Sequence, residues 1–194
     1  MSGVDNERRP RPGITARDMA QIAVFAALIA ALGLPGSITV GFTGVPITVQ
    51  TLGVLLAGAV LGPRKGTAAV AVFIALTIIG LPLLSGGRTG LTALAGPSAG
   101  YLVGWLPAAL FIGLLTARIV PKYPVLPALL INAAGGIVII YFFGTLGLLL
   151  RTDIALWPAI TSNGVYLPGD LLKVVVATMV AKGVHRAYPG LIRA

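Results

Sequence analysis

The segment Tyr-Leu-Pro-Gly-Asp-Leu-Leu-Lys at residues 166–173 opens the last long apolar run of the chain and carries two opposite charges into it. On a helix, Asp170 and Lys173 lie roughly 60° apart around the axis, within reach of one ligand. A charged side chain costs about 2.5–3.5 kcal/mol at the centre of a bilayer and less near its interface. Charges kept in such a segment therefore indicate a candidate binding site.

The same spacing also permits a simpler interpretation. Asp170 and Lys173 are suited to a local ion pair that neutralises itself at a helix end, with Asp170 close to the positive end of the helix dipole. The two residues alone leave both interpretations open.

Composition places the chain among integral membrane proteins. Of its 194 residues, 57% are hydrophobic and only 10% are charged, and the mean hydropathy is +0.98. Soluble domains carry roughly 25% charged residues. At about 20 residues per crossing, this length holds six helices and their loops, but no separate catalytic domain. Cysteine is absent, which excludes disulfides and thiolate metal sites, and we expect neither a metal nor a cofactor.

We predict an all-α integral membrane protein with three parts: a disordered basic leader at 1–18, a six-helix transmembrane domain at 19–187 and a cytoplasmic tail at 188–194. The expected spans are residues 19–34, 49–61, 67–84, 101–117, 126–150 and 168–184. A basic leader before a short apolar run is also typical of a cleaved signal peptide. At least five apolar segments follow, so we interpret the first run as a span.

Basic residues are divided unevenly between the two ends of these spans. Six crossings place eleven Lys and Arg on the side of the N-terminus and two in the opposite loops. This bias predicts cytoplasmic termini in a multi-pass protein of the inner membrane, and it explains the formal charge of +9 without nucleic acid. The eleven are Arg8, Arg9, Arg11, Arg17, Arg64, Lys65, Arg118, Lys122, Lys182, Arg186 and Arg193, and the two are Arg88 and Arg151.

The predicted topology gathers three unusual features at the outer face. The loop at 35–48 is rich in Gly, Pro and Thr but still apolar, and non-helical backbone at membrane depth must be buried or line a cavity. We therefore expect a lid or re-entrant loop. Arg88 and the start of the sixth span lie at the same mouth.

Two further polar residues lie near the ends of spans. Gln50, at the start of the second span, is predicted to bind a ligand or another helix, and His185 is expected to be solvated at the cytoplasmic end.

A row of small residues marks the first span. Ala23, Ala27 and Ala31 recur every four residues, with Ala26 and Ala30 in an adjacent row. Small residues at this spacing let a second helix approach closely in lipid. We predict that the first row docks a partner subunit; packing within the chain is the alternative.

The polar groups at the predicted mouth suit binding better than catalysis. A carboxylate accepts hydrogen bonds, an ammonium donates them, and a guanidinium holds a carboxylate in a bidentate manner. Together they match a small ligand with N–H groups and an acidic group. No span contains glutamate, and the G-x-x-x-x-G-K-[ST] motif of ATP-binding loops is missing.

A set of short motifs, weak singly but specific together, covers nearly the whole chain after residue 18: Ile47–Leu52, Leu55–Gly58, Leu61–Arg64, Gly80–Pro82, Ser85–Gly87, Gly96–Gly104 and Pro168–Lys173. These motifs resemble those of the BioY family, the biotin-specific substrate-binding (S) components of energy-coupling-factor (ECF) vitamin transporters. One departure is Ser98, where many relatives have threonine.

The resemblance implies the six-helix ECF S-component fold, capture of biotin at the outer face, and delivery through a transmembrane coupling protein and cytoplasmic ATPase subunits. It implies that Asp170 accepts from the ureido N–H groups, Lys173 donates to the ureido oxygen and Arg88 pairs with the valerate carboxylate, although the two ends could be exchanged. Gln50 and Tyr166 are secondary candidates for the ligand.

Ala23, Ala27 and Ala31 would then dock on the coupling protein. Two other functions stay open. One is a self-sufficient secondary transporter of biotin in which Asp170 titrates, and the other is a small intramembrane enzyme, which one Asp and one Lys support poorly.

Overall fold

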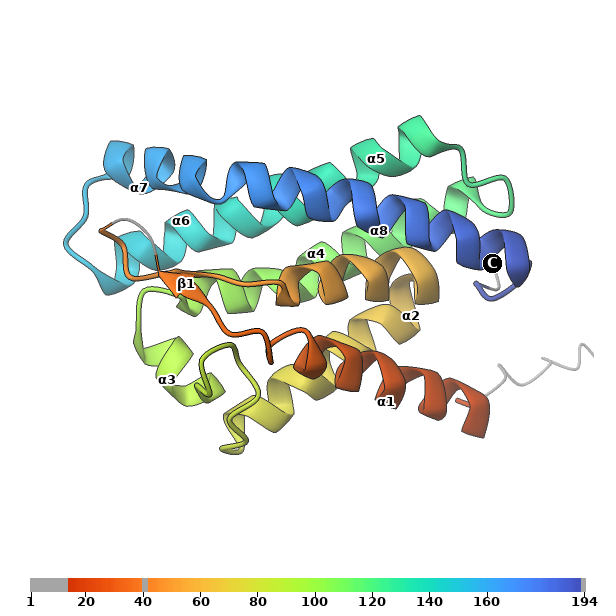
Figure 1. Ribbon diagram of the computed structural model, residues 1–194, viewed down its shortest axis with the longest axis horizontal. Coiled ribbons are helices and arrows are strands. Elements are labelled where there is room, and N and C mark those ends of the chain that lie inside the picture. Colours follow the sequence, from red (N-terminus) through yellow and green to blue (C-terminus); the bar gives the residue numbers. More distant parts are fainter. Residues whose placement is uncertain (1–13, 40–41, 193–194) are drawn as a thin grey trace, which may run out of the picture.

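The computed structural model describes residues 14–39 and 42–192, and the predicted leader up to residue 13 and Arg193 lie outside them. Helices run along one direction of an elongated bundle (Figure 1). They are α1 (Ala16–Ala31), α2 (Gln50–Ile78), α3 (Gly90–Ala95), α4 (Ala99–Ile119), α5 (Val125–Ala133), α6 (Ile140–Arg151), α7 (Leu156–Ser162) and α8 (Leu167–Ala187). A π-helical segment, Ala134–Ile139, joins α5 to α6, and a 3₁₀ turn, Asn163–Val165, precedes α8.

The first helix begins earlier than predicted. Thr15 caps α1 by accepting a hydrogen bond from the backbone of Asp18, and the Asp18 side chain accepts one from Thr15 in return, which forms a capping box. Residues 16–18, assigned above to the leader, are therefore helical. The boundary was missed because the helix starts in polar residues, before the apolar run begins.

Helix α2 contains a sharp reversal, seen in Figure 1 as two arms that diverge. Gly62 has a φ of +78°, in the left-handed region that glycine adopts without strain. The predicted turn, residues 62–66 between the second and third expected spans, is therefore tighter than expected, since residues 63–78 already form the second arm. That arm ends at Ile78 rather than at residue 84.

The prediction that His185 is solvated is wrong. Its side chain is 4% exposed, and its Nε2 lies 2.8 Å from the carbonyl oxygen of Ala59. That carbonyl has no helical donor four residues later because Pro63 lacks an N–H. A carbonyl only accepts, so His185 donates. The histidine thus fastens the end of α8 to the reversal in α2.

In the described part of the chain, three helical stretches are long and apolar enough to cross a membrane: Gln50–Ile78, Ala99–Ile119 and Val125–Arg151. The bent pair Leu156–Val165 and Leu167–Ala187, with a 55° bend, makes a fourth. With the two arms of α2 counted separately and α1 included, the bundle has six principal helical segments. The chain is an all-α membrane protein, whereas the cytoplasmic placement of its termini stays a prediction.

The loop before α2 forms a β-hairpin, which the sequence did not predict. Strands β1 (Ile38–Thr39) and β2 (Pro46–Ile47) pair in antiparallel fashion. The hairpin lies at the end of the bundle where α8 begins (Figure 1). At the same end, α4 approaches α6 so closely that a Cβ on Gly100 would overlap the backbone of Phe143. This contact joins α4 to α6, whereas α8 packs mainly on α2 and α5.

Candidate functional site

A cavity of about 70 Å³ lies between β2 and helices α2, α4, α6 and α8. All five residues predicted to bind substrate border it: Gln50, Arg88, Tyr166, Asp170 and Lys173. The other lining residues are Val45, Pro46, Ile47, Thr48, Thr51, Leu84, Ala93, Ser98, Tyr101, Leu102, Trp105, Ile140 and Tyr141. The open volume suffices for a few water molecules, so a larger ligand requires lining side chains or the hairpin to move outward.

Asp170 is the centre of a hydrogen-bonded cluster contributed by three helices. Its Oδ1 lies 2.8 Å from Lys173 Nζ, and its Oδ2 accepts a 2.8 Å hydrogen bond from the hydroxyl of Tyr141. Lys173 also donates to Thr51 Oγ1 at 2.9 Å. The side chains of Asp170 and Lys173 are only 12% and 13% exposed. The ion pair of the simpler interpretation therefore exists, and it borders the cavity.

The cluster keeps unused hydrogen-bonding capacity. An ammonium has three donors, of which Lys173 uses two. A carboxylate has about four acceptor positions, of which Asp170 uses two. At this end of the cavity, Asp170 can therefore accept further hydrogen bonds from a ligand, and Lys173 can donate one. Such a combination fits a neutral group that has both N–H donors and a carbonyl oxygen.

Arg88 provides a positive charge elsewhere along the wall. It ends a tight turn, which Gly86 and Gly87 allow with φ angles of +78° and +70°. Its Nε donates to the Ser85 carbonyl at 3.4 Å and its Nη1 to Ser98 Oγ at 3.2 Å. Burial lowers the pKa of Arg88.

In residues 14–39 and 42–192, no carboxylate lies within ion-pair distance of Arg88. A guanidinium has five donors, so three of them are unused. The partly buried guanidinium therefore favours an anionic ligand group.

Gln50 borders the cavity, but its amide is engaged by backbone. Nε2 donates to the carbonyls of Ile29 at 3.1 Å and Leu83 at 2.9 Å, and Oε1 accepts from the Ser85 amide at 2.9 Å. Of the two roles predicted for Gln50, these contacts favour the structural one. The amide fixes the turn that carries Arg88.

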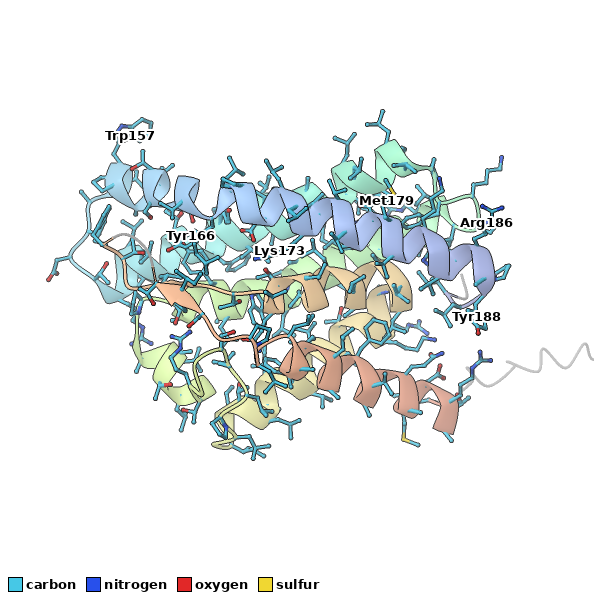
Figure 2. All side chains as sticks on the ribbon, in the orientation of Figure 1. Trp157, Tyr166, Lys173, Met179, Arg186 and Tyr188 are labelled. Carbon is cyan, nitrogen blue, oxygen red and sulfur yellow. The ribbon has the colours of Figure 1, made fainter. Side chains whose placement is uncertain are left out.

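Tyr166 connects the start of α8 to the hairpin. Its hydroxyl lies 3.1 Å from the carbonyl of Val45, to which it donates, and 3.0 Å from Thr43 Oγ1. Figure 2 shows Tyr166 and Lys173 on the inner side of the helix, whereas Trp157 projects away from the bundle. The hydroxyl of Tyr166 therefore holds the hairpin against the cavity.

Several cavity residues were not identified from the sequence. Tyr141 and Thr51 complete the Asp170 cluster, and Ser98 holds Arg88. One signal was present on the fourth span, where Ser98, Tyr101 and Trp105 recur at helical spacing on one face. Tyr141 had no comparable signal, because its hydroxyl reaches Asp170 from another helix, α6, only in the folded bundle.

The small residues of α1 separate into two rows. Ala23, Ala27 and Ala31 are exposed, whereas Ala26 is 4% exposed and packs inward. Lys65 Nζ lies 3.3 Å from Asp18 Oδ1 and donates to Gln21 Oε1 at 2.7 Å, which holds α1 against the second arm of α2. The row predicted to dock a partner therefore lies on the surface.

The profile of the BioY family matches residues 6–190. This chain belongs to the BioY family. The biotin transporter BioY of Rhodobacter capsulatus is 47% identical over 188 residues, which are 92% of this chain and 98% of that protein. The biotin transporter BioY of Rhizobium etli is 42% identical over 181 residues, which cover 91% of this chain and 97% of that protein.

A solved structure shares the fold. It is the crystal structure, at 2.1 Å, of the S-component for biotin from an ECF-type ABC transporter. It superposes with a TM-score of 0.85 and 32% sequence identity, and the match covers 90% of this chain and 95% of that one. The predicted membrane architecture, the ECF S-component fold, is thereby confirmed.

Proposed function

We propose that this chain captures biotin at the outer face of the inner membrane and carries it inward as the S component of an ATP-driven ECF transporter. Its relatives are named biotin transporters. The observation that carries the proposal is the distribution of unused polar groups in the cavity. Acceptors and a donor remain at Asp170 and Lys173, and Arg88 stands apart as a cation with no ion-pair partner among the described residues.

This distribution matches the two ends of biotin. The ureido group has two N–H donors for Asp170 and one oxygen for Lys173, and the valerate carboxylate suits the bidentate guanidinium of Arg88. The exchanged orientation is less favourable, because the ligand carboxylate would then lie beside Asp170 and share its ammonium. Repulsion between two carboxylates around one cation opposes that arrangement.

Equilibrium binding to the solubilised protein tests the proposal. We expect saturable binding of biotin and no competition by unrelated vitamins, because each buried polar group left unpaired costs about 1–3 kcal/mol. Desthiobiotin should bind more weakly because it lacks the sulfur and therefore loses van der Waals contacts in the cavity. Equal binding of unrelated vitamins, or none of biotin, would refute it.

Replacing Ala27 by leucine tests the docking row. Added bulk on this exposed face should leave biotin affinity unchanged but cost about 1–3 kcal/mol in contact with a closely packed partner helix. This cost corresponds to a roughly 5- to 150-fold weaker association of the variant with the coupling protein. The readout is ATP-dependent uptake of biotin into vesicles that contain the coupling protein and the ATPases, which depends on this association.

Val180→Phe serves as its control, since Val180 is 45% exposed on α8. Normal uptake by Ala27→Leu would count against the docking row.

A second experiment tests secondary transport. Biotin accumulation in vesicles that contain this chain alone, driven by an ion gradient, would support secondary transport instead.

Replacing Tyr166 by phenylalanine should loosen the hairpin. The change removes the hydroxyl that contacts Val45 and Thr43. A net loss of about 0.5–1.5 kcal/mol corresponds to release of biotin about 2- to 12-fold faster. Stopped-flow dissociation measures the rate. Tyr188→Phe is the matched control, because Tyr188 is 64% exposed. An unchanged rate in Tyr166→Phe would show that this hydroxyl does not restrain the ligand.

A further inference from the structure

Trp105 is a cavity residue with an unsatisfied donor. It is 6% exposed on α4, and its ring centroid lies 5.9 Å from that of Phe73 at an interplanar angle of 32°. The indole borders the cavity, yet its Nε1 is buried with no hydrogen-bond acceptor among the residues that the structure describes. Buried N–H groups without a partner are rare in folded proteins. This one therefore requires an explanation.

The position of Trp105 along the bundle associates it with one end of the ligand. It follows Ser98, the partner of Arg88, by seven residues, which is nearly two helical turns and about 10 Å along α4. Lys173 lies six residues into α8, about 9 Å from its start. Both helices begin at the same end of the bundle and run in the same direction (Figure 1). Trp105 and Lys173 are therefore at similar depth, farther in than Ser98.

In the orientation proposed above, two acceptors of biotin come to that depth, the ureido oxygen and the ring sulfur. A thioether is a weak acceptor, whereas a carbonyl oxygen has two lone pairs. Lys173 has one unused donor and fills one of these lone pairs. The other is left for a second donor. Among the residues that line the cavity, Trp105 carries a buried donor without a partner.

We propose that Trp105 is a specificity residue whose indole N–H donates to the ureido oxygen of biotin beside Lys173. The inference rests on the proposed function. It assigns two donors from different helices to one oxygen. A ligand that lacks this oxygen then leaves both donors unpaired, which predicts strong selection for the ureido group.

Two tryptophans in the sequence make a direct test possible. Trp157 is 73% exposed and projects away from the bundle (Figure 2), so the Trp157→Phe variant should bind normally and retain Trp105 as its one indole. In ¹⁵N-labelled Trp157→Phe protein, saturating biotin should move the Trp105 indole N–H resonance downfield and slow its exchange with water. A resonance that biotin leaves in place would overturn the proposal and leave Trp105 a packing partner of Phe73.

The Trp105→Phe variant identifies the acceptor. We expect biotin to bind about 2- to 12-fold more weakly, the usual effect of one hydrogen bond. The same factor should hold for desthiobiotin, which keeps the ureido group without the sulfur, and for biotinamide, which keeps it without the carboxylate. A factor that disappears with desthiobiotin or with biotinamide would overturn the assignment to oxygen. If biotin fails to bind the unmodified chain, the proposed function itself fails.

Discussion

Replacing Asp170 by asparagine should abolish high-affinity biotin binding. The substitution leaves the Lys173 ammonium buried without its counter-charge, and it puts an N–H₂ group where ureido N–H groups need acceptors. Breaking a buried ion pair by removing one partner costs about 3–5 kcal/mol, and a loss of that size in binding weakens affinity by roughly 150- to 5,000-fold. Isothermal titration of the solubilised variant with biotin measures the loss.

Asp153→Asn is the matched control, because Asp153 is an exposed carboxylate in the loop before α7; its affinity should equal that of the unmodified chain. A double variant, Asp170→Leu with Lys173→Leu, separates binding from bracing of the helix. It removes both charges, so no buried charge is stranded, and the fold should survive. Normal biotin binding by the double variant would show that the pair braces α8 and does not read the ligand.

Replacing Arg88 by glutamine should remove recognition of the carboxylate end. Hydrogen bonds to charged groups contribute about 1.5–3 kcal/mol, so biotin affinity should fall by roughly 10- to 150-fold. Biotinamide, in which the carboxylate is neutralised, should bind the variant and the unmodified chain with similar affinity. Competition assays with both ligands measure the ratio.

Arg151→Gln provides the control, since Arg151 is an exposed cation at the end of α6, next to the other loop that is predicted to face outward and to carry a basic residue. Equal losses for biotin and biotinamide in Arg88→Gln would mean that Arg88 only holds its turn through Ser85 and Ser98. If the variant loses no affinity for either ligand, the carboxylate lies at Lys173 and the ends are exchanged.

Much of the architecture was predictable because it depends on properties of single segments. Long apolar runs identify helices in a bilayer, and the distribution of Lys and Arg predicts their orientation. Asp170 and Lys173 were found for the same reason. Two charges at helical spacing inside an apolar run are visible without a fold, and their contact is local.

Boundaries and side-chain partners were less predictable because they depend on contacts between distant segments. The reversal at Gly62 is set by one residue, so hydropathy placed it too broadly. Gln50 was open to two roles until the carbonyls of Ile29 and Leu83 were located. His185 was assigned to solvent, since its acceptor, Ala59, lies 126 positions away in sequence.

The sequence by itself determined that this is a six-segment membrane protein of the BioY family with a charged pair at the start of its last helix. Only the tertiary structure decided what surrounds that pair. Tyr141 on α6 reaches Asp170 on α8, Tyr166 holds the hairpin, and Trp105 on α4 borders the same cavity. The physical reason is the separation in sequence over which each effect acts. Hydropathy and helical spacing act within one segment, whereas a binding cavity is formed by side chains from distant segments that only folding brings together.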